Sequence, residues 1–151
     1  MFGRVVVAGL ALVATGVLSG ASAQDQWTKM GSFDADLSRG SAVVDLERAK
    51  GSFKAFRVNV VEGEAKLINI QVRYLNGQAH NERRAINLLR NERSRAIDQR
   101  AAERFVDGAT VCFETGQKGQ AKFEIFGLQS RKGASAARPA VKTALTWPAA
   151  C

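Results

Sequence analysis

The stretch YLNGQAHNERRAINLLRNERSRAIDQRAAERF, Tyr74 to Phe105, decides between an all-β protein and a mixed one. Its Asn76-Gly77 pair is typical of a β-hairpin, because a type I′ turn needs positive φ at both of its central positions. From Asn81 to Asp107 there is no glycine or proline, and Ala, Leu, Arg and Glu dominate. Residue propensity alone therefore favours a helix over this second part.

The apolar residues of the same stretch do not follow a helical period. Residues 90–95 are all polar, so the i, i+3, i+4 stripe of an amphipathic helix is interrupted. The stretch divides more naturally into RRAINLL, a polar turn RNERS, and RAIDQ. We therefore predict that Tyr74 to Phe105 is mostly strand–turn–strand, and we leave open a helical turn at 88–93.

The rest of the chain alternates apolar and polar residues with a period of two. The clearest segments are FRVNVV (56–61), LINIQVRYL (67–75), ATVCFET (109–115) and AKFEIFGL (121–128), and the weaker ones are WTKMGSF (27–33) and SAVVDLE (41–47). Such alternation, with turn-forming residues between the segments, is typical of half-buried antiparallel strands. The expected fold is all-β, a small antiparallel β-sandwich of about seven to eight strands.

Residues 1–23 have the layout of a secretory signal peptide, with Arg4 before an apolar run and small residues at Ala21 and Ala23. The uninterrupted apolar run, Val5 to Ala14, is shorter than the roughly 20 residues that a membrane-spanning helix needs. We therefore expect cleavage after Ala23, an exported protein in the periplasm or outside the cell, and no transmembrane segment after cleavage.

The exported chain is expected to hold one β-sandwich domain, 24–130, and a flexible or loosely docked Ala/Pro-rich basic tail, 131–151. An exported compartment is oxidising, and an even number of cysteines there favours a disulfide. Alternation places Cys112 on the face opposite Val111 and Phe113, where the tail could bring Cys151 to it. The alternative is an intermolecular bridge through Cys151, so the oligomeric state stays open.

The order of these segments resembles a family of small exported bacterial proteins, a domain of unknown function that is expected to form β-sandwiches. The resemblance rests on FKAFRVNV, INIQVRYLNGQ, RAINLLRNERSRAID, ERFVDGATVCFET and AKFEIFGLQ, and it extends from Trp27 to Gln129. In that family the segment like SRAID is extended and follows a turn that is often glycine-rich, whereas Asn91 and Glu92 stand there in this chain. Family members have no assigned activity, so the resemblance implies a fold and carries over no functional residue.

An arginine cluster is the unusual feature of this basic chain, whose formal net charge is +8. Its members are Arg83, Arg84, Arg90, Arg93, Arg95, Arg100 and Arg104. The planar guanidinium suits phosphate and carboxylate groups. We therefore expect anionic lipid, lipopolysaccharide or acidic glycan as partner, bound by a candidate anion site of Arg83, Arg84, Arg93 and Arg95.

The alternative interpretation of the cluster is a solvated, ion-paired surface. Four acidic residues are interleaved with the arginines and could neutralise them: Glu82, Glu92, Asp98 and Glu103. Aromatic residues on which bases could stack are not interleaved with the arginines, which disfavours nucleic acid as the partner.

The sequence shows no recognisable catalytic pattern. Its single histidine, His80, follows the predicted hairpin, and no serine or cysteine has a G-x-S-x-G context. Two cysteines are too few and too widely spaced for a metal site, so neither a metal nor another cofactor is expected. We expect a non-enzymatic protein that binds anionic envelope components through a basic face. The alternative is a hydrolase or another enzyme whose site is not legible in the sequence.

Overall fold

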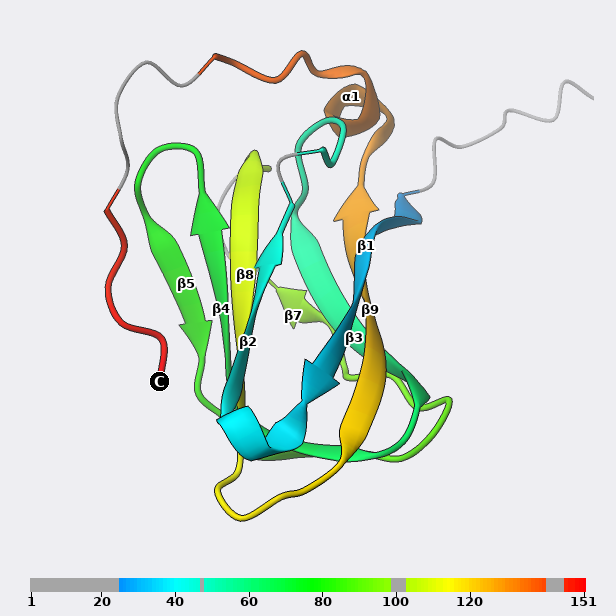
Figure 1. Ribbon diagram of the computed structural model, residues 1–151. Coiled ribbons are helices and arrows are strands. Elements are labelled where there is room, and N and C mark those ends of the chain that lie inside the picture. The colour runs from blue at the N-terminus through cyan, green and yellow to red at the C-terminus, as the bar shows by residue number, and fades with distance from the viewer. Residues whose placement is uncertain (1–24, 47, 99–102, 141–145) are drawn as a thin grey trace, which may run out of the picture.

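A computed structural model describes residues 25–46, 48–98, 103–140 and 146–151 of the chain (Figure 1). The expected signal peptide, 1–23, lies outside the described residues, and so does Arg100 of the arginine cluster. Among the described residues, no helix is long and apolar enough to cross a membrane. Two short helical segments, η1 (Leu37–Arg39) and α1 (Arg131–Ser135), accompany the strands in this part of the chain.

The strands form two antiparallel sheets, which Figure 1 shows as separate layers. The four-stranded sheet has the order β1 (Gln26–Asp36), β9 (Gln120–Gln129), β3 (Ala55–Glu62) and β7 (Ile97–Asp98). The five-stranded sheet has the order β2 (Ser41–Asp45), β8 (Val106–Phe113), β4 (Ala65–Tyr74) and β5 (Ala79–Glu82), with β6 (Ile86–Leu88) also paired to β4. The all-β expectation is confirmed. The described residues hold nine strands where seven to eight were expected, because β5, β6 and β7 are short and lack a clear alternation.

The core lies between the two sheets and takes one face of each. Phe123 on β9 stacks on Phe33 of β1 in its own sheet, with ring centroids 5.0 Å apart, and on Phe113 of β8 in the other sheet, at 5.7 Å. Val58 and Val60 on β3 are fully buried beside them. These residues occupy alternate positions of their strands, so the period-two alternation in the sequence does separate core from surface.

The described part of Tyr74 to Phe105 is strand–turn–strand, as predicted, and contains no helix. β4 and β5 form the expected hairpin, but the prediction of a type I′ turn is wrong. Gly77 has φ 82° whereas Asn76 has negative φ. The amide of Tyr74 donates to the carbonyl of Gln78 at 2.9 Å, so the loop has three residues and places its single left-handed position at Gly77.

Residues 88–93 form a tight turn, and no helical turn occurs there. The amide of Glu92 donates to the carbonyl of Leu89 at 2.9 Å, and Asn91 between them has φ 64°. Asparagine is one of the few residues other than glycine that enter the left-handed region readily. Asn91 therefore supplies the backbone conformation that a glycine would provide in a glycine-rich turn.

The tail returns to the five-stranded sheet after α1. Cys151 forms a disulfide with Cys112 on β8, with Cα atoms 5.9 Å apart, so the intramolecular pairing is confirmed. Cys112 is fully buried, although its neighbours Val111 and Phe113 point into the core and it does not. The tail is what covers it.

Glu103 ties the start of the tail to the domain. Its Oε1 accepts a hydrogen bond from the amide of Ser130 at 3.0 Å, and its Oε2 accepts one from the hydroxyl of Ser52 at 3.1 Å. Burial acts to raise the pKa of the Glu103 carboxyl, but the hydrogen bonds from Ser130 and Ser52, together with the charge of Lys54, outweigh it. The pKa of Glu103 is therefore lower than its ordinary value.

Replacing Phe123 by alanine should lower the free energy of unfolding by about 3–5 kcal/mol, because the ring packs against aromatic residues of both sheets and leaves a cavity. Val43→Ala is the matched control, since Val43 is 71% exposed and its truncation should change stability by less than about 0.5 kcal/mol. Urea unfolding followed by circular dichroism measures both. Equal effects of the two substitutions would contradict the role given to Phe123.

Glu103→Gln should destabilise the protein at neutral pH and matter progressively less on acidification. A carboxyl whose pKa is lowered in the folded state stabilises that state above the unfolded-state pKa, about 4.3. This stabilisation is lost as the pH falls through the lower folded-state pKa. Urea unfolding of both proteins between neutral and acidic pH should show the stability difference narrowing, whereas a constant difference would argue against an ionised Glu103.

Candidate functional site

Residues 89–95, the arginine loop, run along the edge of β3. Three backbone hydrogen bonds hold the loop there. The amide of Asn91 donates to the carbonyl of Val60 at 2.8 Å, and the amide of Val60 donates to the carbonyl of Glu92 at 2.9 Å. The amide of Ser94 donates to the carbonyl of Val58 at 2.7 Å. The loop thus pairs with the part of the β3 edge that β7 does not cover. Arg93 lies between Glu92 and Ser94, whose backbone groups bond to β3.

Ser94 completes this attachment through its side chain. Its hydroxyl oxygen accepts a hydrogen bond from the amide of Val58 at 2.9 Å, and the hydroxyl donates to the carbonyl of Arg95 at 3.0 Å. Ser94 is buried between two exposed arginines, Arg93 and Arg95. Sequence reasoning missed this positioning role. The one local signal was a small hydroxyl residue inside an otherwise charged run.

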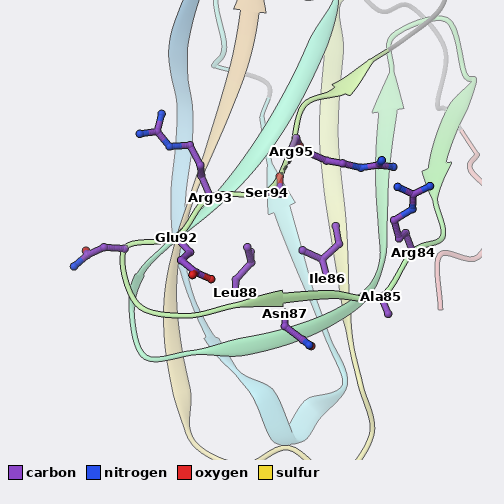
Figure 2. Close-up of a pocket in the computed structure, with 10 residues that line it drawn as sticks. Arg84, Ala85, Ile86, Asn87, Leu88, Glu92, Arg93, Ser94 and Arg95 are labelled. Atoms are coloured by element: carbon purple, nitrogen blue, oxygen red, sulfur yellow. Dashed lines mark hydrogen bonds between the residues drawn. The ribbon is translucent and has the colours of Figure 1, made fainter.

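A groove of about 650 Å³ lies between β6 and the arginine loop (Figure 2). Arg84, Arg93 and Arg95 line it, and Ile86 and Leu88 contribute apolar wall. In Figure 2 the side chains of Arg84 and Arg95 extend to the same side of the groove, and Arg93 extends to the opposite side. The groove therefore offers guanidinium groups at both ends of a partly apolar floor.

The structure brings together three of the four arginines selected from the sequence. Arg83 is exposed but does not line the groove. Arg104 lies elsewhere, with its Nη1 donating to the side chain of Gln78 at 2.9 Å beside the β4–β5 turn. Sequence spacing alone could not show that Arg84 lines the groove and that Arg83 and Arg104 do not. Which arginines reach the groove depends on how the chain turns between β5 and the arginine loop.

The interleaved acids neutralise the groove incompletely. Arg95 forms an ion pair with Glu82, with Nη2 and Oε1 2.8 Å apart. Within the described part of the chain, Arg84 and Arg93 form no ion pair. Glu92 turns its carboxylate to the amide of Leu89, at 2.9 Å. Two guanidinium groups in the groove are therefore available to an anion.

Arg57 on β3 extends the positive region onto the outer face of the four-stranded sheet. Its guanidinium carbon lies 4.2 Å from the centroid of the Trp27 ring and 5.6 Å from that of Phe126. Burial, and then the charge of Arg93, lower the pKa of Arg57 below its ordinary value. Since Arg57 and Arg93 repel each other, an anion that contacts both would be favoured.

The chain matches the family model of a domain of unknown function, DUF2541, over residues 5–127. The protein belongs to this family. No curated protein and no solved structure matches the chain. The resemblance seen in the sequence is thus confirmed at the level of the family. The DUF2541 match includes the whole arginine loop, whereas Cys151 and its segment of the tail lie beyond it.

Among the described residues of this DUF2541 protein, neither the histidine nor a group of metal-binding side chains lies in the groove. His80 is half-buried, with its Nε2 3.7 Å from Oε2 of Glu82, and it does not line the groove. In the regions that the structure describes, no three His, Cys, Asp or Glu side chains are grouped to hold a metal ion. The groove is lined by three arginines, by Asn87 and Asn91, by Glu92 and Ser94, and by a short apolar wall.

Ser94→Ala should loosen the arginine loop, because the buried amide of Val58 loses its acceptor. The expected cost is about 1–3 kcal/mol. Hydrogen exchange should show lost protection at the amides of Val58, Val60 and Ser94. Ser135→Ala at the end of α1 is the matched control and should leave these amides unchanged. Unaltered exchange in Ser94→Ala would show that the loop is held by its backbone contacts alone.

Proposed function

We propose that the protein is an exported, non-enzymatic β-sandwich that binds an anionic component of the cell envelope through the groove of Arg84, Arg93 and Arg95. The observation that carries this proposal is that Arg84 and Arg93 line one groove and have no ion-pair partner in the described residues. A planar guanidinium binds phosphate and carboxylate with two parallel hydrogen bonds.

The walls of the groove support a ligand that is both anionic and partly apolar. Ile86 lines the groove and is half-buried. Leu89 in the arginine loop does not line the groove, but it is 55% exposed and adds apolar surface next to Leu88 in the chain. Phospholipid headgroups and lipopolysaccharide combine phosphate groups with acyl chains, and an acidic glycan combines carboxylates with the apolar faces of sugars. All three share the feature that the groove recognises, an anionic group beside apolar surface.

Export of the protein rests on two features that support each other. Residues 1–23 have the layout of a signal peptide. Disulfides persist mainly in oxidising compartments, and the chain pairs Cys112 with Cys151. In the periplasm or at the cell surface, the basic groove would face membranes and glycans that carry a high density of negative charge.

The test measures binding of the mature protein, residues 24–151, to vesicles of neutral phospholipid with and without anionic phospholipid, to lipopolysaccharide, and to an acidic glycan. Arg84→Gln/Arg93→Gln/Arg95→Gln should weaken binding to the cognate ligand on the order of 100-fold, at about 1 kcal/mol per charge near an anionic surface. The salt dependence of binding should fall as well, because salt screens exposed charges.

The matched control removes the same charge elsewhere on the surface, through Arg39→Gln/Arg48→Gln/Arg131→Gln. All three of these arginines are exposed and lie outside the groove. The single variant Arg83→Gln should likewise bind almost as the wild type does. Equal loss in the groove variant and the control, or no binding of any of the ligands by the wild type at low salt, would overturn the proposed function.

A further inference from the structure

The outer face of the five-stranded sheet carries buried polar residues, which is unusual for a face that points away from the core. Asn69, Gln71 and Arg73 occupy alternate positions of β4 and share this face, opposite the core residues Ile70 and Val72. Asn69 is 5% exposed and Gln71 is 1% exposed. Buried amides need hydrogen-bond partners, and here the partners come from the tail.

The tail crosses β4 in the antiparallel sense and meets these three residues in turn. Asn69 Nδ2 donates to the carbonyl of Ala150 at 2.6 Å, and Gln71 Nε2 donates to the carbonyl of Pro148 at 3.0 Å. The guanidinium carbon of Arg73 lies 5.3 Å from the centroid of the Trp147 ring. Asn69, Gln71 and Arg73 thus contact tail residues in reverse order along the chain.

The two amides also bond to β5, independently of the tail. Oδ1 of Asn81 on β5 accepts hydrogen bonds from Asn69 Nδ2 at 3.2 Å and from Gln71 Nε2 at 3.3 Å. The remaining donor capacity of both amides points to the alternate carbonyls of an extended chain. Main-chain carbonyls belong to every peptide, so these contacts select an extended backbone, and the arginine selects an aromatic side chain next to it.

The described residues of the tail do not fill this face. A space of about 380 Å³ remains beside it, lined by Ser41 and Val43 of β2, by Thr110 of β8, and by Arg73 and Trp147. Val43 at its rim is 71% exposed, the largest exposed fraction among the large apolar side chains of the described residues. An extended peptide with more side-chain volume than the Ala-rich tail would fit against β2 as well.

We propose that Asn69, Gln71 and Arg73 form a peptide-binding surface, that the tail occupies it as a ligand tethered through Cys112, and that its partner is an extended protein segment with an aromatic residue beside proline. This surface is separate from the arginine groove, and the inference does not depend on the proposed anion binding. The disulfide keeps the tail at a high local concentration beside the surface. Reduction of the disulfide would lower that concentration and allow another segment to compete for the surface.

The first experiment uses the intact mature chain and measures the effective concentration of its two thiols in a glutathione buffer. Protein dithiol and oxidised glutathione exchange to protein disulfide and two molecules of reduced glutathione. Trp147→Ala should lower the effective concentration roughly fivefold, since its stacking on Arg73 is lost. Gln71→Leu should lower it roughly three- to tenfold, because one hydrogen bond is lost.

Thr146→Ala is the matched control for this measurement, because Thr146 lies in the same segment and is exposed. It should leave the effective concentration unchanged. Trp147→Ala changes the tail and not the sheet, so its result does not depend on how well Gln71→Leu folds. An effective concentration within twofold of the wild type in Trp147→Ala would show that the tail is a mere tether and would overturn the proposal.

The second experiment supplies the segment from outside. The probe is the peptide TWPAAS, and the protein is the mature chain with Cys112→Ser, Cys151→Ser and Trp147→Ala, whose own tail competes weakly. Titration followed by NMR should shift the side-chain amide signals of Asn69 and Gln71, with a dissociation constant on the order of 1 mM or tighter. The peptide TAPAAS should bind at least about fivefold more weakly. Equal shifts with both peptides, or none with TWPAAS, would contradict the surface.

Discussion

The packing of Phe123 against Phe113 couples the two sheets, and the surface features of the molecule depend on that coupling. Phe123 lies on β9, which pairs with both β1 and β3, and Phe113 lies on β8, which pairs with both β2 and β4. The two rings therefore join the inner strands of both sheets. With the two sheets packed together in this way, one edge of β3 pairs with the arginine loop. The polar outer face of β4 contacts the tail.

The edge of β3 shows that stability and candidate function can use the same atoms. An open sheet edge presents unpaired amides and carbonyls that can pair with other chains, and charged residues commonly protect such edges. The arginine loop satisfies Val58 and Val60 and leaves Arg93 on the surface. Edge protection alone explains the loop and its charge. Edge protection does not explain why Arg84, which precedes β6, lines the same groove as Arg93. The presence of both arginines in one groove is what favours a ligand.

The parts of the fold that could be predicted from the sequence are those that local chemistry determines. Alternation identified the buried positions of β3 and β9, and it placed Cys112 away from the core, within reach of Cys151. The roles of Ser94 and of the buried amides could not be predicted in this way. Asn69 and Gln71 look like solvent-facing residues of an amphipathic strand, and only the arrival of the distant tail makes them interior.

The same limit applies to the candidate site. Four arginines could be selected from their spacing, but the turn at Asn91 and the pairing of the loop with β3 decide that Arg93 and Arg95 join Arg84 and that Arg83 does not. A family of unknown function supplied the fold and no ligand. The position of each guanidinium is a tertiary property, set by backbone contacts between segments that are far apart in the sequence.

The place of β9 between β1 and β3 has a consequence for the order in which the domain assembles. β9 is the last of the described strands along the chain, yet it pairs with both β1 and β3. β1 is synthesised long before β9 and cannot pair until β9 is present. Such pairing between segments far apart in the sequence slows folding. Strands β4, β5 and β6 pair with near neighbours in the sequence and can form first. Completion of the four-stranded sheet is therefore paced by the arrival of its central strand.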